Sequence, residues 1–214
     1  MQKNKDLIDI TSKFGDVNKL IVERKKLAND ASRIRRKLKT QYEKYSFLME
    51  MVGVNSASTP LVNSIVKCFK ELGFDDVHNV DKITGQEDIR LYVEDKLIIF
   101  EVTGIDSDKP QYKKAHSISM HKPIREQQNP NKKVFAVFIV NHDNKKHFKN
   151  RNKKPFEKGI IEIAEANKYG LITTIELFYA FVAVKMGKLS REEILNKICT
   201  NGEIKIEVAK SPEE

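Results

Sequence analysis

Several common features are missing from this 214-residue chain. No apolar run approaches the roughly 20 residues that cross a bilayer, and the segment from Met1 to Asp6 lacks the apolar core of a secretory signal. The only cysteines, Cys68 and Cys199, lie far apart and share no metal-ligand spacing with other residues. We therefore expect a cytoplasmic protein with two reduced thiols.

Several chemical signatures are missing as well. The sequence contains no Gly-rich phosphate loop, no Ser-based nucleophile elbow and no Cys-x-x-Cys pair. His142 and His147 with Asp143 could be drawn as a zinc site, but no third ligand stands at a suitable spacing. The chemistry of the protein must therefore be sought in other residues.

The positive charge is concentrated at the amino terminus. The formal net charge is +9, and residues 1–52 contribute 13 Lys/Arg against 7 Asp/Glu, or +6. A basic appendage on a nearly balanced domain indicates an anionic partner, most commonly nucleic acid. A Lys-rich helix face that is merely solvated is the alternative.

Glycine and proline are absent from Val17 to Val52. Steps of three and four residues give an apolar seam of coiled-coil type, interrupted by Arg24 and Gln41. Its apolar members are Val17, Leu20, Leu27, Ala31, Ile34, Leu38, Tyr45, Leu48 and Val52. A helix of this length spans about 54 Å, more than the remaining domain can cover. We predict a helical partner, most simply in a homodimer; the alternative is that its second half packs on the domain and the rest frays.

The remaining chain alternates helices and strands. We predict a basic coiled-coil-like helix at 1–52, a linker at 53–60 and an α/β domain at 61–214. Within the domain, helices are expected at 61–72, 158–168, 175–186 and 191–198. Strands are expected at 75–80, 88–93, 96–103, 134–140, 170–174 and 203–208. The continuous apolar run at 134–140 is typical of a central strand covered on both faces.

Two predicted neighbouring strands each have a carboxylate near one end. Gly85-Gln86-Glu87-Asp88-Ile89 begins the first strand, and Ile99-Phe100-Glu101-Val102-Thr103-Gly104 ends the second. Asp88 and Glu101 can converge on one divalent cation beside a phosphodiester. An ordinary polar hairpin end is the alternative, although Glu101 follows four apolar residues and would be costly to bury without a partner.

These residues, with Leu72-Gly73-Phe74 before them, resemble the PD-(D/E)xK, or restriction-endonuclease-like, superfamily over about residues 61–198. The resemblance implies that Asp88, Glu101 and the backbone carbonyl of Val102 hold Mg²⁺ or Mn²⁺. The Lys of the family motif falls on Thr103, which has no positive charge, and the first helix has no acid at Leu61-Val62-Asn63-Ser64. Lys113 and Lys114 could supply the missing cation, and Lys122 and Arg125, close behind them, are further candidates. Gln127 matches a Gln that often faces the site in related sequences; a surface amide is its alternative.

Basic side chains gather in the segment 141–154 and around Arg33, Arg35 and Arg36 of the N-terminal helix. The segment 141–154 follows the predicted central strand, at the end where α/β sheets usually place ligands. Its interleaved Asn, His and Phe suit phosphate contact and base stacking, and a flexible basic loop without a partner is the alternative. The predicted nucleic-acid contacts are Arg33, Arg35, Arg36, Lys145, Lys146, Lys149, Arg151, Lys153 and Lys154.

Two functions follow from these residues. The first is a magnesium-dependent endonuclease with an altered active site, acting on DNA rather than RNA; defence against foreign DNA is implied by the resemblance only. The second is a catalytically degenerate nuclease fold that binds nucleic acid or protein. Thr103 favours the second, whereas retention of both Asp88 and Glu101 favours the first.

Overall fold

The computed structural model describes residues 2–53, 58–83, 87–110 and 112–206, without the side chains of residues 2–14, 17, 18 and 112–114. This chain divides by packing into two compact units, residues 1–46 and 47–214. The predicted domain bounds at 52 and 61 stay a prediction. Within the described residues, no helix is long and apolar enough to cross a membrane.

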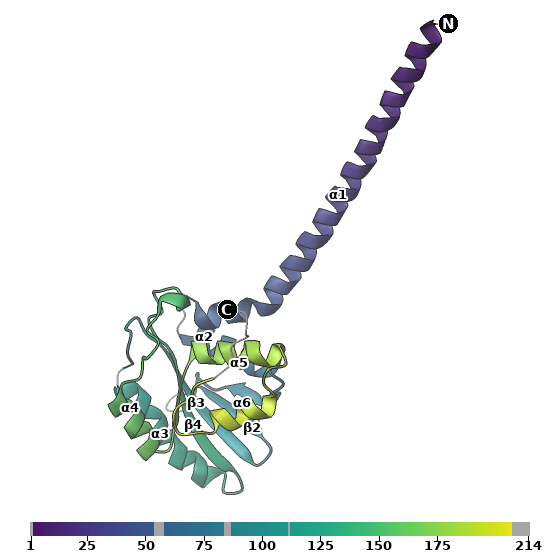
Figure 1. Ribbon diagram of the computed structural model, residues 1–214. Helices are drawn as coiled ribbons and strands as arrows, with labels where there is room; N and C mark the ends of the chain where they lie inside the picture. Colours follow the sequence, from purple (N-terminus) through teal and green to yellow (C-terminus); the bar gives the residue numbers. More distant parts are fainter. Residues whose placement is uncertain (1, 54–57, 84–86, 111, 207–214) are drawn as a thin grey trace. The chain divides into compact units, whose positions relative to one another are not determined.

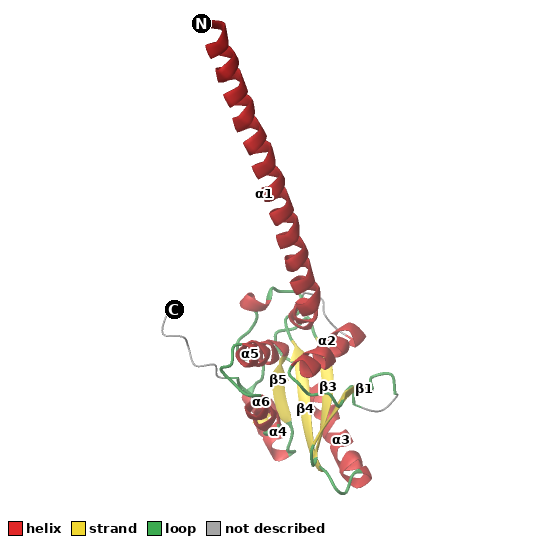
Figure 2. Ribbon diagram, turned by 90° about the vertical axis from the view of Figure 1, so that its right-hand side faces the viewer, coloured by secondary structure: helices red, strands yellow, loops and turns green. Residues whose placement is uncertain are grey.

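The second unit is built around a six-stranded mixed sheet in which the strands follow their order in the sequence. The strands are β1 (Val77–Asn79), β2 (Ile89–Val93), β3 (Lys96–Gly104), β4 (Lys133–Asn141), β5 (Gly170–Thr173) and β6 (Gly202–Glu203). β1, β2 and β3 pair antiparallel, and β3 to β6 pair parallel. Figure 2 shows β5, β4, β3 and β1 in this order across the sheet. The predicted mixed α/β fold is confirmed.

Helices cover both faces of this sheet, and Figure 1 shows α3 and α4 on one side of β3 and β4, with α5 and α6 on the other. The helices are α2 (Ser58–Glu71), α3 (Tyr112–Gln128), α4 (Lys158–Ala166), α5 (Thr174–Lys185) and α6 (Arg191–Ile198), with the short 3₁₀ helix η1 (Phe148–Asn150). Because strand side chains alternate, Leu97 and Ile99 pack towards α3 and α4. Phe100 instead packs on Phe69 of α2, with ring centroids 5.0 Å apart.

Helix α1 runs from Gln2 to Val52 and is 51 residues long, so it begins 15 residues before the predicted seam. In the first unit, the apolar side chains Leu20, Leu27, Ile34 and Leu38 of the seam are 54–64% exposed. Val17, the first seam position, lies outside the described side chains. An apolar row of this kind along a helix is the surface that a partner helix would cover.

The last turns of α1 belong to the second unit. Phe47, Met51 and Val52 are buried, and the ring of Phe47 meets that of Phe181 on α5 edge-on at 5.5 Å. The core of the second unit thus includes residues that lie before the predicted linker.

Candidate functional site

Asp88 lies at the entry to β2 as an extra residue in the hairpin. Ile89 is the register partner of Phe100, yet the backbone N–H of Asp88 also donates to the Phe100 carbonyl at 2.9 Å. Two residues on one strand therefore oppose one on the other, as in a β-bulge, which redirects a side chain locally. Asp88 Oδ2 accepts the backbone N–H of Val102 on β3 at 2.6 Å. The structure thus brings Asp88 and Val102 together.

Glu101 precedes Val102 on the same strand and is half-buried. By strand alternation its side chain lies on the face of Ile99, towards α3. The N–H and C=O of one residue in an antiparallel strand point to the same neighbour, so the Val102 carbonyl also faces β2. This backbone arrangement supports the predicted oxygen ligands, and the sharing of one cation by Asp88 and Glu101 stays a prediction.

A third carboxylate, Asp81, was missed from the sequence. It follows β1, and its Oδ2 accepts the Thr59 hydroxyl at 2.9 Å. Its buried Oδ1 has no hydrogen-bond partner within the described residues. The sequence could have indicated this residue, because Asp81 is an acidic residue directly after the strand predicted at 75–80.

The surroundings of Asp88 disfavour its negative charge. Burial raises the pKa of Asp88 above its ordinary value; the Val102 hydrogen bond opposes this, and the charges of Asp81 and Glu87 add to it. Neighbouring carboxylate oxygens, one of which (Asp81 Oδ1) is buried without a hydrogen-bond partner within the described residues, suit a hard divalent cation such as Mg²⁺. Within the described residues, however, no group of three or more His, Cys, Asp or Glu side chains is placed to hold a metal.

Glu87 has a different role from its neighbour Asp88. It is fully buried and receives Arg125 Nε on Oε1 at 2.9 Å and Arg125 Nη2 on Oε2 at 3.0 Å, while Arg90 also donates to Oε1. Burial pushes the pKa of Glu87 upward, but the hydrogen bonds from Arg125 and Arg90 outweigh it and hold this pKa below its usual value. Glu87 and Arg125 therefore join β2 to α3 as a buried ion pair.

The other predicted catalytic residues differ in whether they lie near the β2–β3 hairpin. Thr103 is buried on β3, two residues beyond Glu101 and on the same face of the strand. The side chains of Lys113 and Lys114 lie outside the described residues. Gln127 is exposed and stands two residues from the sheet-facing Arg125, about 200° around the helix. The structure therefore does not bring Gln127 to the hairpin.

The beginning of segment 141–154 is a buried polar network rather than a flexible basic loop. Asn141, His142, Asp143 and Asn144 are at most 3% exposed. The Asn141 side-chain oxygen accepts the Thr174 hydroxyl at 3.1 Å and also bonds to Arg151. This network lies at the carboxyl end of β4, as the sequence predicted.

The Arg151 side chain bonds to groups of the chain itself. It is 4% exposed, and its Nη2 donates to the carbonyls of Val52 at 2.9 Å and Gly53 at 3.1 Å. Its Nε donates to the Lys146 carbonyl at 3.0 Å. The guanidinium therefore binds the chain at the end of α1, and the predicted phosphate contact of Arg151 is wrong because these groups occupy it.

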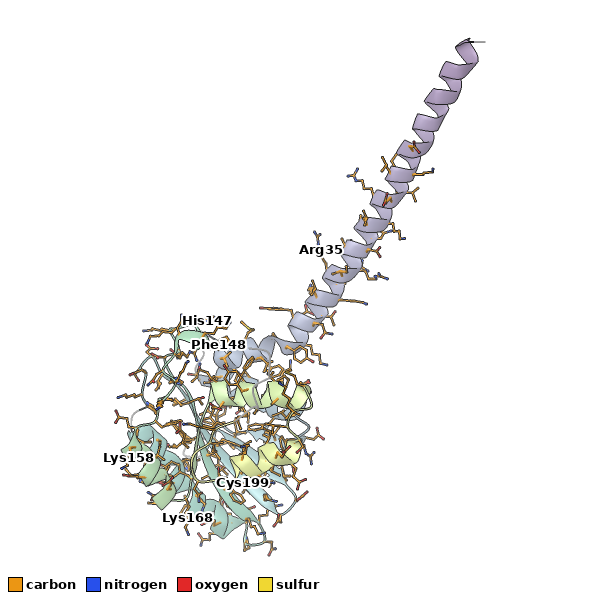
Figure 3. All side chains as sticks on the ribbon, viewed as in Figure 1. Arg35, His147, Phe148, Lys158, Lys168 and Cys199 are labelled. Atoms are coloured by element: carbon orange, nitrogen blue, oxygen red, sulfur yellow. The ribbon has the colours of Figure 1, made fainter. Side chains whose placement is uncertain are left out.

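The other predicted phosphate contacts lie on the surface. Lys145 pairs with Asp106 at 2.5 Å and Lys146 with Asp143 at 3.0 Å. The exposed residues Lys149, Lys153 and Lys154 form no ion pair with a described carboxylate. On α1, Arg33 pairs with Asp30 at 3.1 Å, and Arg35, labelled in Figure 3, is exposed like Arg36.

Comparison with known proteins identifies the fold. The second unit has the architecture of a restriction-endonuclease-like domain. The chain is similar to the solved structure of the restriction endonuclease FokI, with a TM-score of 0.53 and 16% identity over 74% of this chain. It spans about 30% of the length of that enzyme. No protein-family model matches the sequence, and no curated protein matches it.

Proposed function

We propose that this protein is a metal-dependent nuclease that cleaves nucleic-acid phosphodiesters at the β2–β3 hairpin. The observation that supports this most directly is Asp88, which a bulge turns onto the Val102 N–H in a fold shared with a restriction endonuclease. In this proposal Asp88, Glu101 and the Val102 carbonyl bind Mg²⁺ or Mn²⁺. Action on DNA, including foreign DNA, is part of the same proposal and derives from the resemblance to that superfamily.

In this proposal each residue of the site has a separate role in metal binding or charge stabilisation. A bound Mg²⁺ would polarise a phosphoryl oxygen and lower the pKa of a coordinated water. Asp88 and Glu101 provide the negative oxygen ligands, and Thr103 brings no charge to a phosphate. Lys113 and Lys114, at the start of α3, are the proposed source of the missing positive charge. Arg125 cannot replace them while Glu87 binds it.

A second function, binding without cleavage, is favoured by one observation. The position of the motif Lys is occupied by Thr103, which is buried, and a cation at this place normally stabilises charge on the phosphate. In this alternative the protein binds nucleic acid or a protein through its basic surfaces.

Cleavage assays separate the two functions. We expect the purified chain to nick plasmid or cut single-stranded oligonucleotides in Mn²⁺ or Mg²⁺ and to stop when EDTA is added. Gel electrophoresis of end-labelled products measures both effects. Binding without cleavage of any DNA or RNA substrate, in either metal, would establish the alternative.

Dimer formation through α1 is proposed with the same function. Replacing Leu27 and Ile34 together by Asp puts two charges into the apolar seam, and we expect a dimer to become a monomer in light scattering. Binding to duplex DNA should weaken, because a dimer doubles the basic surface. The log–log dependence of binding on salt should also become shallower, by about 0.9 in slope for each phosphate that the monomer no longer neutralises.

Asn29 and Ser32 lie off the seam and provide the matched control. Replacing both by Asp adds the same charge at exposed positions and should leave the dimer intact. A parent chain that is already monomeric at high concentration contradicts the dimer proposal.

A further inference from the structure

A cleft of about 250 Å³ lies apart from the hairpin, at the carboxyl ends of β4 and β5. His142 follows β4, Thr173 ends β5, and Glu176 and Tyr179 line the cleft from the first turns of α5. The volume is below the roughly 300–1,000 Å³ of pockets for drug-sized ligands. The cleft therefore suits a single base ring, with the sugar and phosphate of its nucleotide at the rim.

Aromatic rings form one border of the cleft. Phe148 and Tyr179 both line it. The Phe148 ring packs on His147 with centroids 4.7 Å apart and on Phe178 with centroids 5.9 Å apart, and Phe178 meets Tyr179 at 5.8 Å. Figure 3 shows His147 and Phe148 beside each other. Rings held in place by such packing are suitable surfaces for base stacking.

Charge differs between the two sides of the cleft. Lys149 and Lys153 line it from the segment after β4 and are exposed, whereas the carboxylates of Glu176 and Glu203 line it from α5 and β6. Glu203 is paired with Lys205 at 3.1 Å, so Glu176 is the main negative group on that side. Glu176 Oε2 accepts the Ile206 N–H at 2.7 Å, which leaves further acceptor capacity on its carboxylate. The ligand that fits has an anionic group at one end and N–H donors at the other.

His142 lines the cleft as a neutral ring whose Nδ1 is buried. It is 1% exposed, and its Nε2 lies 2.8 Å from the Asn152 carbonyl, an acceptor, so the proton must be on Nε2. Nδ1 is then an acceptor, and it has no partner within the described residues. Burial lowers the pKa of His142, which keeps the ring neutral near pH 7.

We propose that this cleft binds one unpaired nucleotide whose base has an exocyclic amino group, adenine, cytosine or guanine, with its phosphate at Lys149 and Lys153. Phe148 stacks on the base, and Glu176 and Glu203 accept its amino protons. The inference deepens the proposed nuclease function, on which its biological meaning rests, by naming an unpaired strand as the nucleic acid recognised. Uracil and thymine present a carbonyl where cytosine presents an amino group, so the carboxylates should disfavour them.

Calorimetric titration with AMP, CMP, GMP, UMP and dTMP tests this inference on the full chain. AMP, CMP and GMP should bind at least about tenfold more tightly than UMP and dTMP. Phe148→Ala should weaken AMP binding by about tenfold or more, and Phe148→Tyr should preserve it. Glu176→Gln should reduce the preference for CMP over UMP, because Gln can also donate to a carbonyl.

Matched controls separate these effects from folding. Tyr42→Ala removes an exposed ring on α1 and Lys158→Ala an exposed cation on α4; both should leave AMP binding unchanged, whereas Lys149→Ala should weaken it. Equal affinity for all five nucleotides, or no binding at millimolar concentration, overturns the inference. Nucleotide binding without any cleavage contradicts only the nuclease function, and cleavage without nucleotide binding contradicts only this inference.

Discussion

Replacing Asp88 by Asn should reduce metal-dependent cleavage at least about 100-fold, the scale on which loss of one electrostatic group at an active site acts. Asn keeps an oxygen that can accept the Val102 N–H, so the bulge should persist. The substitution removes a negative ligand from the proposed cation site. Initial rates on plasmid DNA at several Mn²⁺ concentrations measure the loss.

The thermal stability of the Asp88→Asn chain, unlike its cleavage rate, should not fall. Burial raises the pKa of Asp88, so its ionised form costs the folded state stability as pH rises through that pKa. Asp88→Asn removes this cost and the repulsion from Asp81 and Glu87. We therefore expect an unchanged or higher Tm at pH 7 together with lost cleavage, a combination that simple unfolding does not produce.

Two further variants complete this test. Glu94→Gln, at the exposed turn of the same hairpin, should retain full cleavage, and Thr103→Lys restores the motif cation and should increase the rate. A Thr103→Lys chain with the parent rate would show that the missing charge is supplied elsewhere. Equal cleavage by the Asp88→Asn and parent chains would eliminate the proposed site.

Breaking the Glu87–Arg125 pair should cause the largest loss of stability. Arg125→Met leaves the Glu87 carboxylate buried and without its main partner, which should lower the free energy of unfolding by about 3–5 kcal/mol. For a domain of this size the Tm should fall by roughly 6–20 °C. Circular dichroism melting measures both quantities.

The pH dependence gives a second measurement of the pair. The pKa of Glu87 lies below its ordinary value of 4.5, so its stabilising contribution is complete above pH 4.5 and is lost as pH falls through the folded-state pKa. In Glu87→Gln, stability should fall less steeply over that acidic range. Glu126→Gln, which breaks the surface pair with Lys122, should cost at most about 1 kcal/mol. An Arg125→Met chain as stable as this control contradicts the assignment.

The sequence by itself determined the order and type of the elements. Apolar residues on either side of the turn at Glu94-Asp95 predicted β2 and β3 within about one residue. The apolar run 134–140 predicted β4, because a strand covered on both faces needs apolar residues throughout. The seam predicted the part of α1 that begins at Val17, and the helix predicted at 1–52 covers the rest of α1. These patterns are local, and the order of helices and strands in the chain follows from them.

Only the tertiary structure decided how the polar residues are used. Glu87 and Asp88 are adjacent, yet one binds Arg125 from 38 positions away and the other a backbone N–H on β3. In the sequence, Arg151 is one more cation of a basic segment. In the structure it is buried, and its guanidinium donates to the carbonyls at the end of α1. A charged side chain is stabilised by whichever distant groups the fold places beside it, and no local pattern specifies those partners.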